Sequence, residues 1–196
     1  MTPSFPDSFN HLKHLPLVVD LDGTLILRDS LTDLFIDMGK RCPWNFLKIP
    51  YWYVRGGRSY VKYHLAKYLK VDPQKLEFHE ALLKTLKQEK SQGRYLVLAT
   101  GANEKIAQDI ADHVGCFHAI LGSTLNKNLT GLRKAERLIA LYGERGFLYA
   151  GNARIDQHVW SKSAGIIVVN PGVGVVAIAQ KVSELHTIPI HFLDAV

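Results

Sequence analysis

The sequence predicts an α/β fold built on a parallel sheet that helices cover on both faces. From about residue 93 onward, short apolar runs alternate with stretches of helical length, and glycines close several of these stretches. Residues 25–92 show a mostly helical pattern without such strands. We therefore expect a core domain formed by residues 1–26 and 93–196, with a helical cap domain inserted at residues 27–92.

The expected elements follow from the hydrophobic pattern in chain order. An apolar run at 17–21 predicts the first strand, and in the cap Leu31, Leu34, Phe35 and Met38 recur at the spacing of one helix face. Prolines and Gly93 delimit two further cap helices, at about 60–69 and 76–89. We then expect strands at 95–100, 118–121, 147–150, 166–169 and 188–193, and helices at 104–114, 132–142, 156–163 and 175–183.

Length and composition indicate an ordinary globular protein with reduced thiols. The chain has 196 residues, a net charge of +6 and two cysteines, Cys42 and Cys116, that lie far apart in sequence. The first 14 residues lack the pattern of a secretory signal, and the longest apolar stretch, 165–179, is too broken to span a bilayer. We therefore expect a cytoplasmic protein, and its positive charge predicts an anionic partner.

The segment 17–24 is the most informative about chemistry. Its strand delivers Asp20 and Asp22 to a turn at Gly23, and the turn lets both carboxylates face one pocket although side chains alternate along a strand. Two close carboxylates repel each other unless a cation lies between them, and hard oxygen ligands suit Mg²⁺. The same residues alone would also fit a strand that ends in an ordinary Asp-Gly turn.

Polar residues at two other strand ends and at one helix complete a set suited to phosphoryl transfer. Ligands of parallel sheets bind beyond the carboxyl ends of the strands. There we expect Thr100 with Gly101 and, after a later strand, Asn152 with Asp156, while Lys134 adds a cation from the start of a helix. Positioning and charge neutralisation dominate phosphoryl transfer, so a nucleophile, an acid, a hydroxyl donor and a cation are the groups it needs.

Each of these residues also has a purely structural interpretation. Thr100 and Asn152 fit ordinary turns, and Asp156 fits the N-cap of a helix. Lys134 fits a solvent-facing helix position beside Arg133. The ordered set, rather than any single residue, favours catalysis.

The order and identity of these residues resemble the haloacid dehalogenase superfamily. The resemblance covers about residues 16–171, with its four motifs at 20–24, Thr100, Lys134 and 151–156. It implies a Rossmann-like, three-layer core, and the insertion after the first motif is similar to the helical C1 cap of the phosphoserine-phosphatase-like branch. The segments 149–152, 159–160 and 168–171 are similar to the phosphatase-like domain fused to polyprenyl-type prenyltransferases, although we expect no such membrane domain in this chain.

The resemblance implies a phosphatase that hydrolyses a phosphate monoester. Asp20 would attack the phosphorus to form an aspartyl-phosphate, Asp22 would act as general acid and then as general base, and Lys134 would offset the negative charge. It implies Mg²⁺ held by Asp20, by the backbone carbonyl of Asp22 and by Asp156 or Asn152. It also implies that Thr100 and the amides near Gly101 and Leu21 bind the phosphoryl oxygens.

Two positions depart from the family pattern and keep other functions open. The fourth motif often begins Gly-Asp, where this chain has Asn152, and the prenyltransferase-fused domains carry a lysine where this chain has Thr130. One alternative is therefore a catalytically weakened binding module that recognises a phosphorylated or lipid partner. A second alternative is a phosphotransferase that passes the phosphoryl group to an acceptor other than water.

The cap sequence is unusually basic and aromatic. Residues 40–70 contain no Asp or Glu but eight Lys or Arg and eight Phe, Trp or Tyr. The simpler interpretation is an aromatic core with a basic outer face. The more specific one is peripheral contact with an anionic membrane or a lipid-linked, prenyl or sugar phosphate, because Trp, Tyr and Lys favour the membrane interface. Nucleic acid ranks lower, because the inferred site is a small capped pocket.

Overall fold

The computed structural model describes residues 5–28, 43–68, 71–125 and 127–193. Cys42 and the predicted helix face of Leu31, Leu34, Phe35 and Met38 lie outside these ranges. Cys116 is a buried free thiol. No helix in the described ranges is long and apolar enough to cross a membrane.

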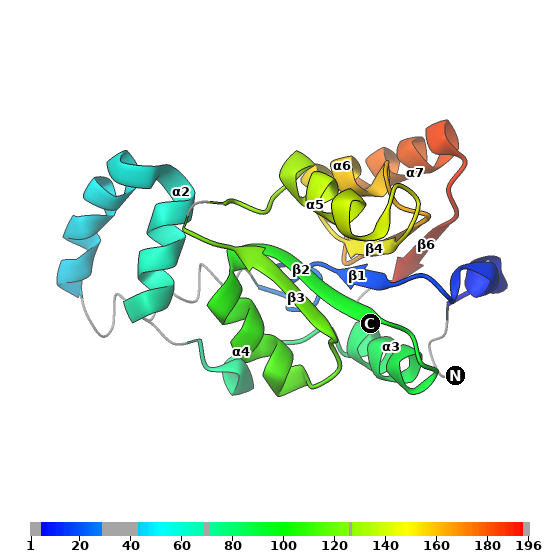
Figure 1. Cartoon of the computed structure of the whole chain (residues 1–196), viewed down its shortest axis with the longest axis horizontal. Helices are drawn as coiled ribbons and strands as arrows, with labels where there is room; N and C mark the ends of the chain where they lie inside the picture. The colour runs from blue at the N-terminus through cyan, green and yellow to red at the C-terminus, as the bar shows by residue number, and fades with distance from the viewer. Residues whose placement is uncertain (1–4, 29–42, 69–70, 126, 194–196) are drawn as a thin grey trace.

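The core is a parallel sheet of six strands in the order β3-β2-β1-β4-β5-β6 (Figure 1). Neighbouring strands pair in parallel throughout, and β1 lies in the middle with β2 on one side and β4 on the other. The strands are β1 Leu17–Val19, β2 Leu96–Asn103, β3 Ala119–Ser123, β4 Leu148–Gly151, β5 Gly165–Val169 and β6 Ile190–Leu193. This confirms the predicted α/β fold with a Rossmann-like sheet.

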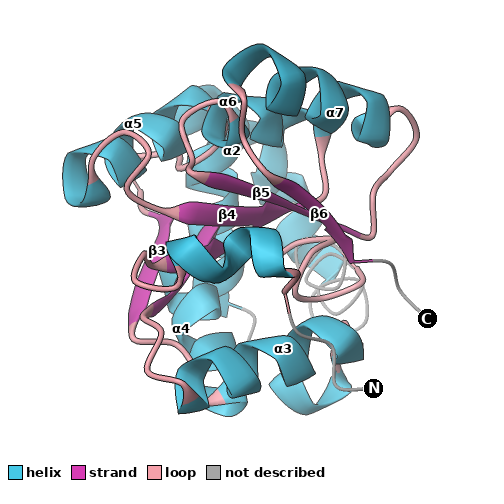
Figure 2. Ribbon diagram, turned by 90° about the vertical axis from the view of Figure 1, so that its right-hand side faces the viewer, coloured by secondary structure: helices cyan, strands magenta, loops and turns pink. Residues whose placement is uncertain are grey.

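Alternating strand residues pack against helices on opposite faces of the sheet (Figure 2). On one face, Leu17 and Val19 join a core cluster with Leu82 of α3 and Ile110 of α4. On the other face, Val18 joins a cluster filled from α5, α6 and α7. The helices of the two faces are α3 Glu80–Ser91 and α4 Glu104–Val114, and α5 Leu132–Tyr142, α6 Gln157–Trp160 and α7 Val175–His186.

The insertion after β1 contributes a helical unit that stands apart from the sheet (Figure 1). A 3₁₀ turn, η2 (Pro43–Lys48), leads into α2 (Ile49–Tyr68), whose helical geometry is broken at Gly56 and Gly57. The buried Trp52 and Val61 attach α2 to the core cluster, and α2 contacts β2. The smaller 3₁₀ turns are η1 Asp7–Leu12, η3 Pro73–Lys75 and η4 Arg154–Asp156.

Three predicted helices differ from the structure in their bounds. The helix expected at 76–89 begins only at Glu80, because Phe78 is extended and bridges Ile26 while His79 caps the helix by accepting the Leu82 amide. The helix expected at 156–163 is replaced by η4 and the single turn of α6. The helix expected at about 60–69 corresponds to the part of α2 that follows the break at Gly56 and Gly57; the part before the break, which begins at Ile49 with Pro50 in its first turn, was not predicted.

The position of α3 bears on the extent of the cap. Leu82 and Leu86 are fully buried against β1 and β2, and two backbone hydrogen bonds, Leu27 N–H to Glu77 and His79 N–H to Leu25, tie the segment before α3 to the end of the first motif. We therefore propose to count α3 with the core and to end the inserted cap before it, rather than at residue 92.

Candidate active site

The site begins where β1 ends. Asp20 follows Val19 directly, and its N–H donates to the carbonyl of Ala150 at 2.9 Å, which extends the pairing with β4 by one residue. The Asp20 side chain is 14% exposed, and its Oδ1 accepts the Leu21 N–H at 2.9 Å. The central strand therefore fixes a carboxylate at the carboxyl end of the sheet, where parallel sheets bind ligands.

Lys134 forms the principal contact of this carboxylate. Its Nζ lies 2.9 Å from Asp20 Oδ1, and only 4% of its side chain is exposed. The first turn of α5 positions Lys134, with the helix beginning directly after Gly131. This burial rules out the interpretation of Lys134 as a solvent-facing helix residue, and the sequence prediction of a cation near Asp20 matches the observed ion pair.

Tyr149 connects the ion pair to a second carboxylate. Lys134 Nζ donates to the Tyr149 hydroxyl at 2.8 Å, and that hydroxyl donates to Asp156 Oδ1 at 3.1 Å. Burial, together with the negative charges of Asp156 and Asp20, raises the pKa of Tyr149 well above its ordinary value, so the hydroxyl keeps its proton. The sequence analysis missed this residue; its one signal was a polar aromatic in the otherwise aliphatic strand β4.

Asp156 is buried behind Tyr149 and held by three hydrogen bonds. Besides the tyrosine hydroxyl, its Oδ2 accepts the N–H groups of Asn152 and Ala153 at 3.0 and 2.9 Å. Gly151 lacks a side chain where a Cβ would lie 2.6 Å from Oδ2, which allows this close approach. Burial first, and then repulsion from Asp20, raise the pKa of Asp156 from 3.8 to about 6, while Lys134 lowers it.

Asn152 packs against the turn of the first motif. Gly23 has a φ of +75°, and a Cβ at this position would overlap the Asn152 side chain. Thr24 Oγ1 donates to Asn152 Oδ1 at 3.3 Å. Asp22 lies half-buried in the same turn, between Asp20 and Gly23. The structure thus brings together the first and fourth motifs, which are about 130 residues apart in sequence.

Thr100 lies within the neighbouring strand β2, three residues before its last residue, Asn103. It is fully buried, and its Oγ1 accepts the Ala102 N–H at 2.9 Å, which orients the hydroxyl. Ser123 donates to the Gly101 carbonyl at 2.9 Å, so the adjacent strand β3 also holds this part of β2. The Leu21 amide, predicted to bind phosphate, donates to Asp20 Oδ1 in this structure.

The oxygen donors around Asp20 and the small net negative charge of the site fit Mg²⁺. In the described ranges, no three His, Cys, Asp or Glu side chains lie together as a metal cluster. Asp156 accepts one hydrogen bond on Oδ1 and two on Oδ2. One buried lysine faces two carboxylates that repel each other, and a divalent cation beside Asp20 relieves that surplus charge. The oxygens of Asp20, of the Asp22 backbone and of Asn152 are hard donors that Mg²⁺ accepts.

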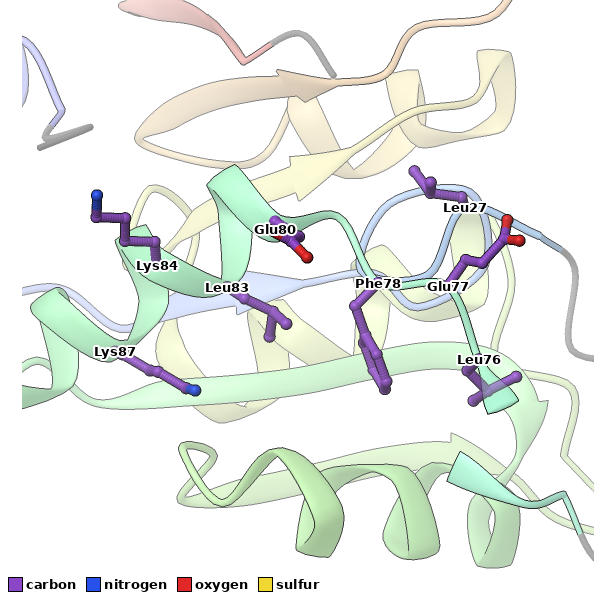
Figure 3. A pocket seen from close by; sticks show the side chains of 8 residues that line it. All are labelled: Leu27, Leu76, Glu77, Phe78, Glu80, Leu83, Lys84 and Lys87. Atoms are coloured by element: carbon purple, nitrogen blue, oxygen red, sulfur yellow. The ribbon is translucent and has the colours of Figure 1, made fainter. Parts of the chain in front are cut away.

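A hollow of about 660 Å³ lies elsewhere on the molecule, beside α3 (Figure 3). Four apolar and four charged side chains line it, and none of the residues near Asp20 is among them. Its lining residues are Leu27, Leu76, Glu77, Phe78, Glu80, Leu83, Lys84 and Lys87. Without a nucleophile or a convergent set of polar groups, it does not compete with the Asp20 cluster as a candidate active site.

Comparison with known proteins agrees with this geometry. The profile of the haloacid dehalogenase-like hydrolases matches residues 17–146. The uncharacterized protein y4nM of Sinorhizobium fredii is 39% identical over 162 residues, which are 82% of this chain but 31% of that protein. The chain thus spans about a third of the length of this relative.

Solved structures share the fold at low sequence identity. A phospho-aspartyl intermediate analogue of phosphoserine phosphatase has a TM-score of 0.58 and 13% identity, with 91% of this chain and 92% of that chain covered. A protein of unknown function from Bordetella pertussis has a TM-score of 0.63 and 14% identity, with 93% and 99% covered. At these identities the likeness concerns the fold.

Proposed function

Because this chain belongs to the haloacid dehalogenase-like hydrolase family, we propose that it is a Mg²⁺-dependent phosphatase that forms an aspartyl-phosphate on Asp20. The observation that supports this most is the 2.9 Å contact between Lys134 Nζ and Asp20 Oδ1 at the end of the central strand. A carboxylate held in one orientation beside a buried lysine is positioned to attack a phosphorus atom.

In the first half of the proposed reaction, an oxygen of Asp20 attacks the phosphorus of a phosphate monoester. The bond from phosphorus to the leaving oxygen breaks as Asp22 donates a proton to that oxygen. Lys134 offsets the charge of the nucleophile and the phosphoryl group. Thr100, whose hydroxyl proton is not used in its contact with Ala102, donates to a phosphoryl oxygen together with the amide of Gly101.

In the second half, Asp22 accepts a proton from a water molecule, which attacks the phosphorus. The bond between Asp20 and phosphorus then breaks and inorganic phosphate leaves. When bound, Mg²⁺ neutralises charge on the phosphoryl oxygens. Asp20, the Asp22 carbonyl and Asp156 or Asn152 are the proposed ligands.

The substrate is proposed to be a small phosphorylated molecule, with lipid-linked, prenyl and sugar phosphates as the first candidates. The basic, aromatic composition of the cap supports this choice, because α2 contacts β2, the strand that contains Thr100. A panel of phosphate monoesters that differ in their apolar chain tests it. Equal turnover of short and prenylated substrates would contradict a lipid-linked substrate without affecting the proposed chemistry.

A direct test uses phosphate release from a generic aryl phosphate. We expect turnover that needs Mg²⁺ and that falls by a factor of about 10³ or more in Asp20→Asn. Asp112→Asn, at an exposed position on α4, is the control and should keep full turnover. Retained turnover in a folded Asp20→Asn protein would refute Asp20 as the nucleophile.

One observation favours a second candidate, a binding module with weakened catalysis. Asn152 puts a neutral side chain at a position that is often acidic in the family, and its contacts are with Gly23 and Thr24. Titration of the protein with Mg²⁺ and inorganic phosphate separates the two functions. Saturable phosphate binding without any release of phosphate from monoesters would favour the binding module.

A further inference from the structure

The turn η2 and the start of α2 form the part of the cap that is farthest from the sheet (Figure 1), and they carry large apolar side chains that are exposed. Three large side chains there are almost fully exposed: Trp44 at 79%, Leu47 at 74% and Val54 at 86%. Tyr51 is also exposed, at 56%. Together with Lys48 and Arg55 these residues form what we call the tip surface. Monomeric proteins rarely gather so many large apolar side chains in water without a partner for them.

Helical spacing brings the tip residues together on one side. Trp44, Leu47, Tyr51 and Val54 follow one another at intervals of three or four residues through η2 and the start of α2. The Arg55 guanidinium lies 5.3 Å from the centre of the Tyr51 ring, so a basic group adjoins this side in α2.

The opposite side of the same helix packs against the protein core. Trp52 is 5% exposed, belongs to the core cluster and stacks on His64 with ring centres 4.9 Å apart. The helix therefore has two apolar sides, of which one holds the cap to the core. The other faces solvent, so core packing does not explain its composition.

The charge around the tip surface indicates which kind of partner it binds. Lys48 and Arg55 are exposed within it, and no acidic residue occurs anywhere from Lys40 to Lys70. Aliphatic side chains beside Trp, Tyr and basic residues fit the boundary of an anionic bilayer, where apolar groups enter the acyl region and cations meet the headgroups. Nucleic acid would use the basic and aromatic groups but offers no apolar phase for Leu47 and Val54.

We propose that the tip surface docks the protein peripherally on anionic lipid bilayers. If the proposed phosphatase function holds, this docking places the site next to phosphate monoesters carried on lipid. Docking itself depends only on the cap residues, so it can be tested without any turnover.

The experiment measures flotation of the full chain with vesicles of phosphatidylcholine, with and without phosphatidylglycerol. We expect binding to the anionic vesicles that is at least about tenfold stronger than to the neutral ones and that weakens with salt. We expect two double variants to bind the anionic vesicles at least about tenfold more weakly than the parent. One is Leu47→Gln with Val54→Gln, and the other is Lys48→Glu with Arg55→Glu. Both should keep turnover of a soluble aryl phosphate, which separates docking from catalysis.

Matched control variants make the same chemical changes elsewhere. Val173→Gln with Leu185→Gln removes two apolar groups that are 92% and 74% exposed, and Lys105→Glu with Lys181→Glu makes the same change of net charge. We expect both to bind within about twofold of the parent. The proposal is overturned if the protein does not float with the vesicles, or if the control variants lose as much vesicle binding as the tip variants. It is also overturned if the tip surface mediates self-association or nucleic-acid binding instead.

Discussion

At the scale of single residues, Lys134 sets the charge balance of the site. It faces Asp20 directly and lowers the pKa of the buried Asp156. We predict that Lys134→Met destabilises the fold by about 3–5 kcal/mol, because removing one partner leaves a nearly buried carboxylate without its cation. Denaturant unfolding measures this, with the exposed neighbour Arg133→Met as control. Equal stability of the two variants would mean that the ion pair is not formed.

Tyr149 is predicted to position Lys134 rather than to react. Tyr149→Phe keeps the buried ring but removes the hydroxyl that accepts from Lys134 and donates to Asp156. We expect kcat to fall by roughly tenfold, about 1.4 kcal/mol, with KM nearly unchanged.

Tyr142→Phe, with a half-buried hydroxyl outside this network, is the control and should keep the parent kcat. The Tyr149→Phe change should also move the pH profile of kcat, which a purely packing role would not do. An unchanged kcat and profile would contradict the positioning role.

The residues of the site could be predicted from sequence only in part. Asp20, Thr100, Lys134 and Asp156 could be proposed because each follows an apolar run or begins a helical pattern, in the order that the family shares. Tyr149 was missed because a tyrosine inside an apolar strand has the same pattern whether it fills a core or joins a network. Hydrogen bonds such as Leu21 N–H to Asp20 depend on turn geometry, which no sequence pattern specified.

At the scale of elements, α3 is attached to the core by a buried ion pair. Arg94 Nε lies 2.8 Å from Glu89 Oε2, with 3% and 5% of the two side chains exposed. We predict that Glu89→Ala costs about 3–5 kcal/mol of stability, because the Arg94 cation is left buried alone.

The exposed pair of Glu77 and Arg28 provides the comparison for this change. These side chains are 3.5 Å apart and 59% and 65% exposed, and Glu77→Ala should cost less than about 1 kcal/mol. Chemical denaturation of both variants measures the two losses of stability. If Glu89→Ala costs no more than Glu77→Ala, α3 is not fixed to the core in this way.

Elements with strong local signals were predicted almost to the residue. The helices at 104–114 and 132–142 end at Gly115 and Gly143, and the structure has α4 and α5 with these bounds. The helix at 76–89 was misplaced at its start, because the extended pairing of Phe78 with Ile26 overrides local helical propensity. Such long-range pairing is invisible in the pattern of one segment.

At the scale of the whole molecule, the buried carboxylate makes stability depend on pH. The pKa of Asp156 rises from 3.8 to about 6 on folding, so the folded protein binds a proton that the unfolded chain releases between these values. In metal-free protein, binding of this proton adds to the free energy of unfolding at about pH 4, and the added stability is lost as the pH rises through 6. The loss is on the order of 3 kcal/mol.

The difference in unfolding free energy between the parent and Asp156→Asn isolates this effect. We expect the parent to lose stability relative to the variant on going from about pH 4 to 7, with both proteins kept free of metal. A difference that is constant with pH, or that grows in favour of the parent, would contradict the raised pKa.

The fold class followed from the alternation of strands and helices, but the arrangement of the whole molecule did not. Sheet order depends on which strands cross over, and the sequence contains no pattern for the 3-2-1-4-5-6 order beyond its resemblance to a family. The composition of residues 40–70 showed a basic, aromatic cap. Only the structure separates the buried Trp52 from the exposed Trp44.

Trapping the covalent intermediate tests the central claim most directly. The protein is mixed with an aryl phosphate and Mg²⁺, quenched in acid within one turnover and digested, and the peptide that contains Asp20 is weighed by mass spectrometry. The account predicts that this peptide gains one phosphoryl group, which is released by mild base and absent in Asp20→Asn. Turnover with the phosphoryl group on another residue, or with no covalent phosphate at all, would contradict it.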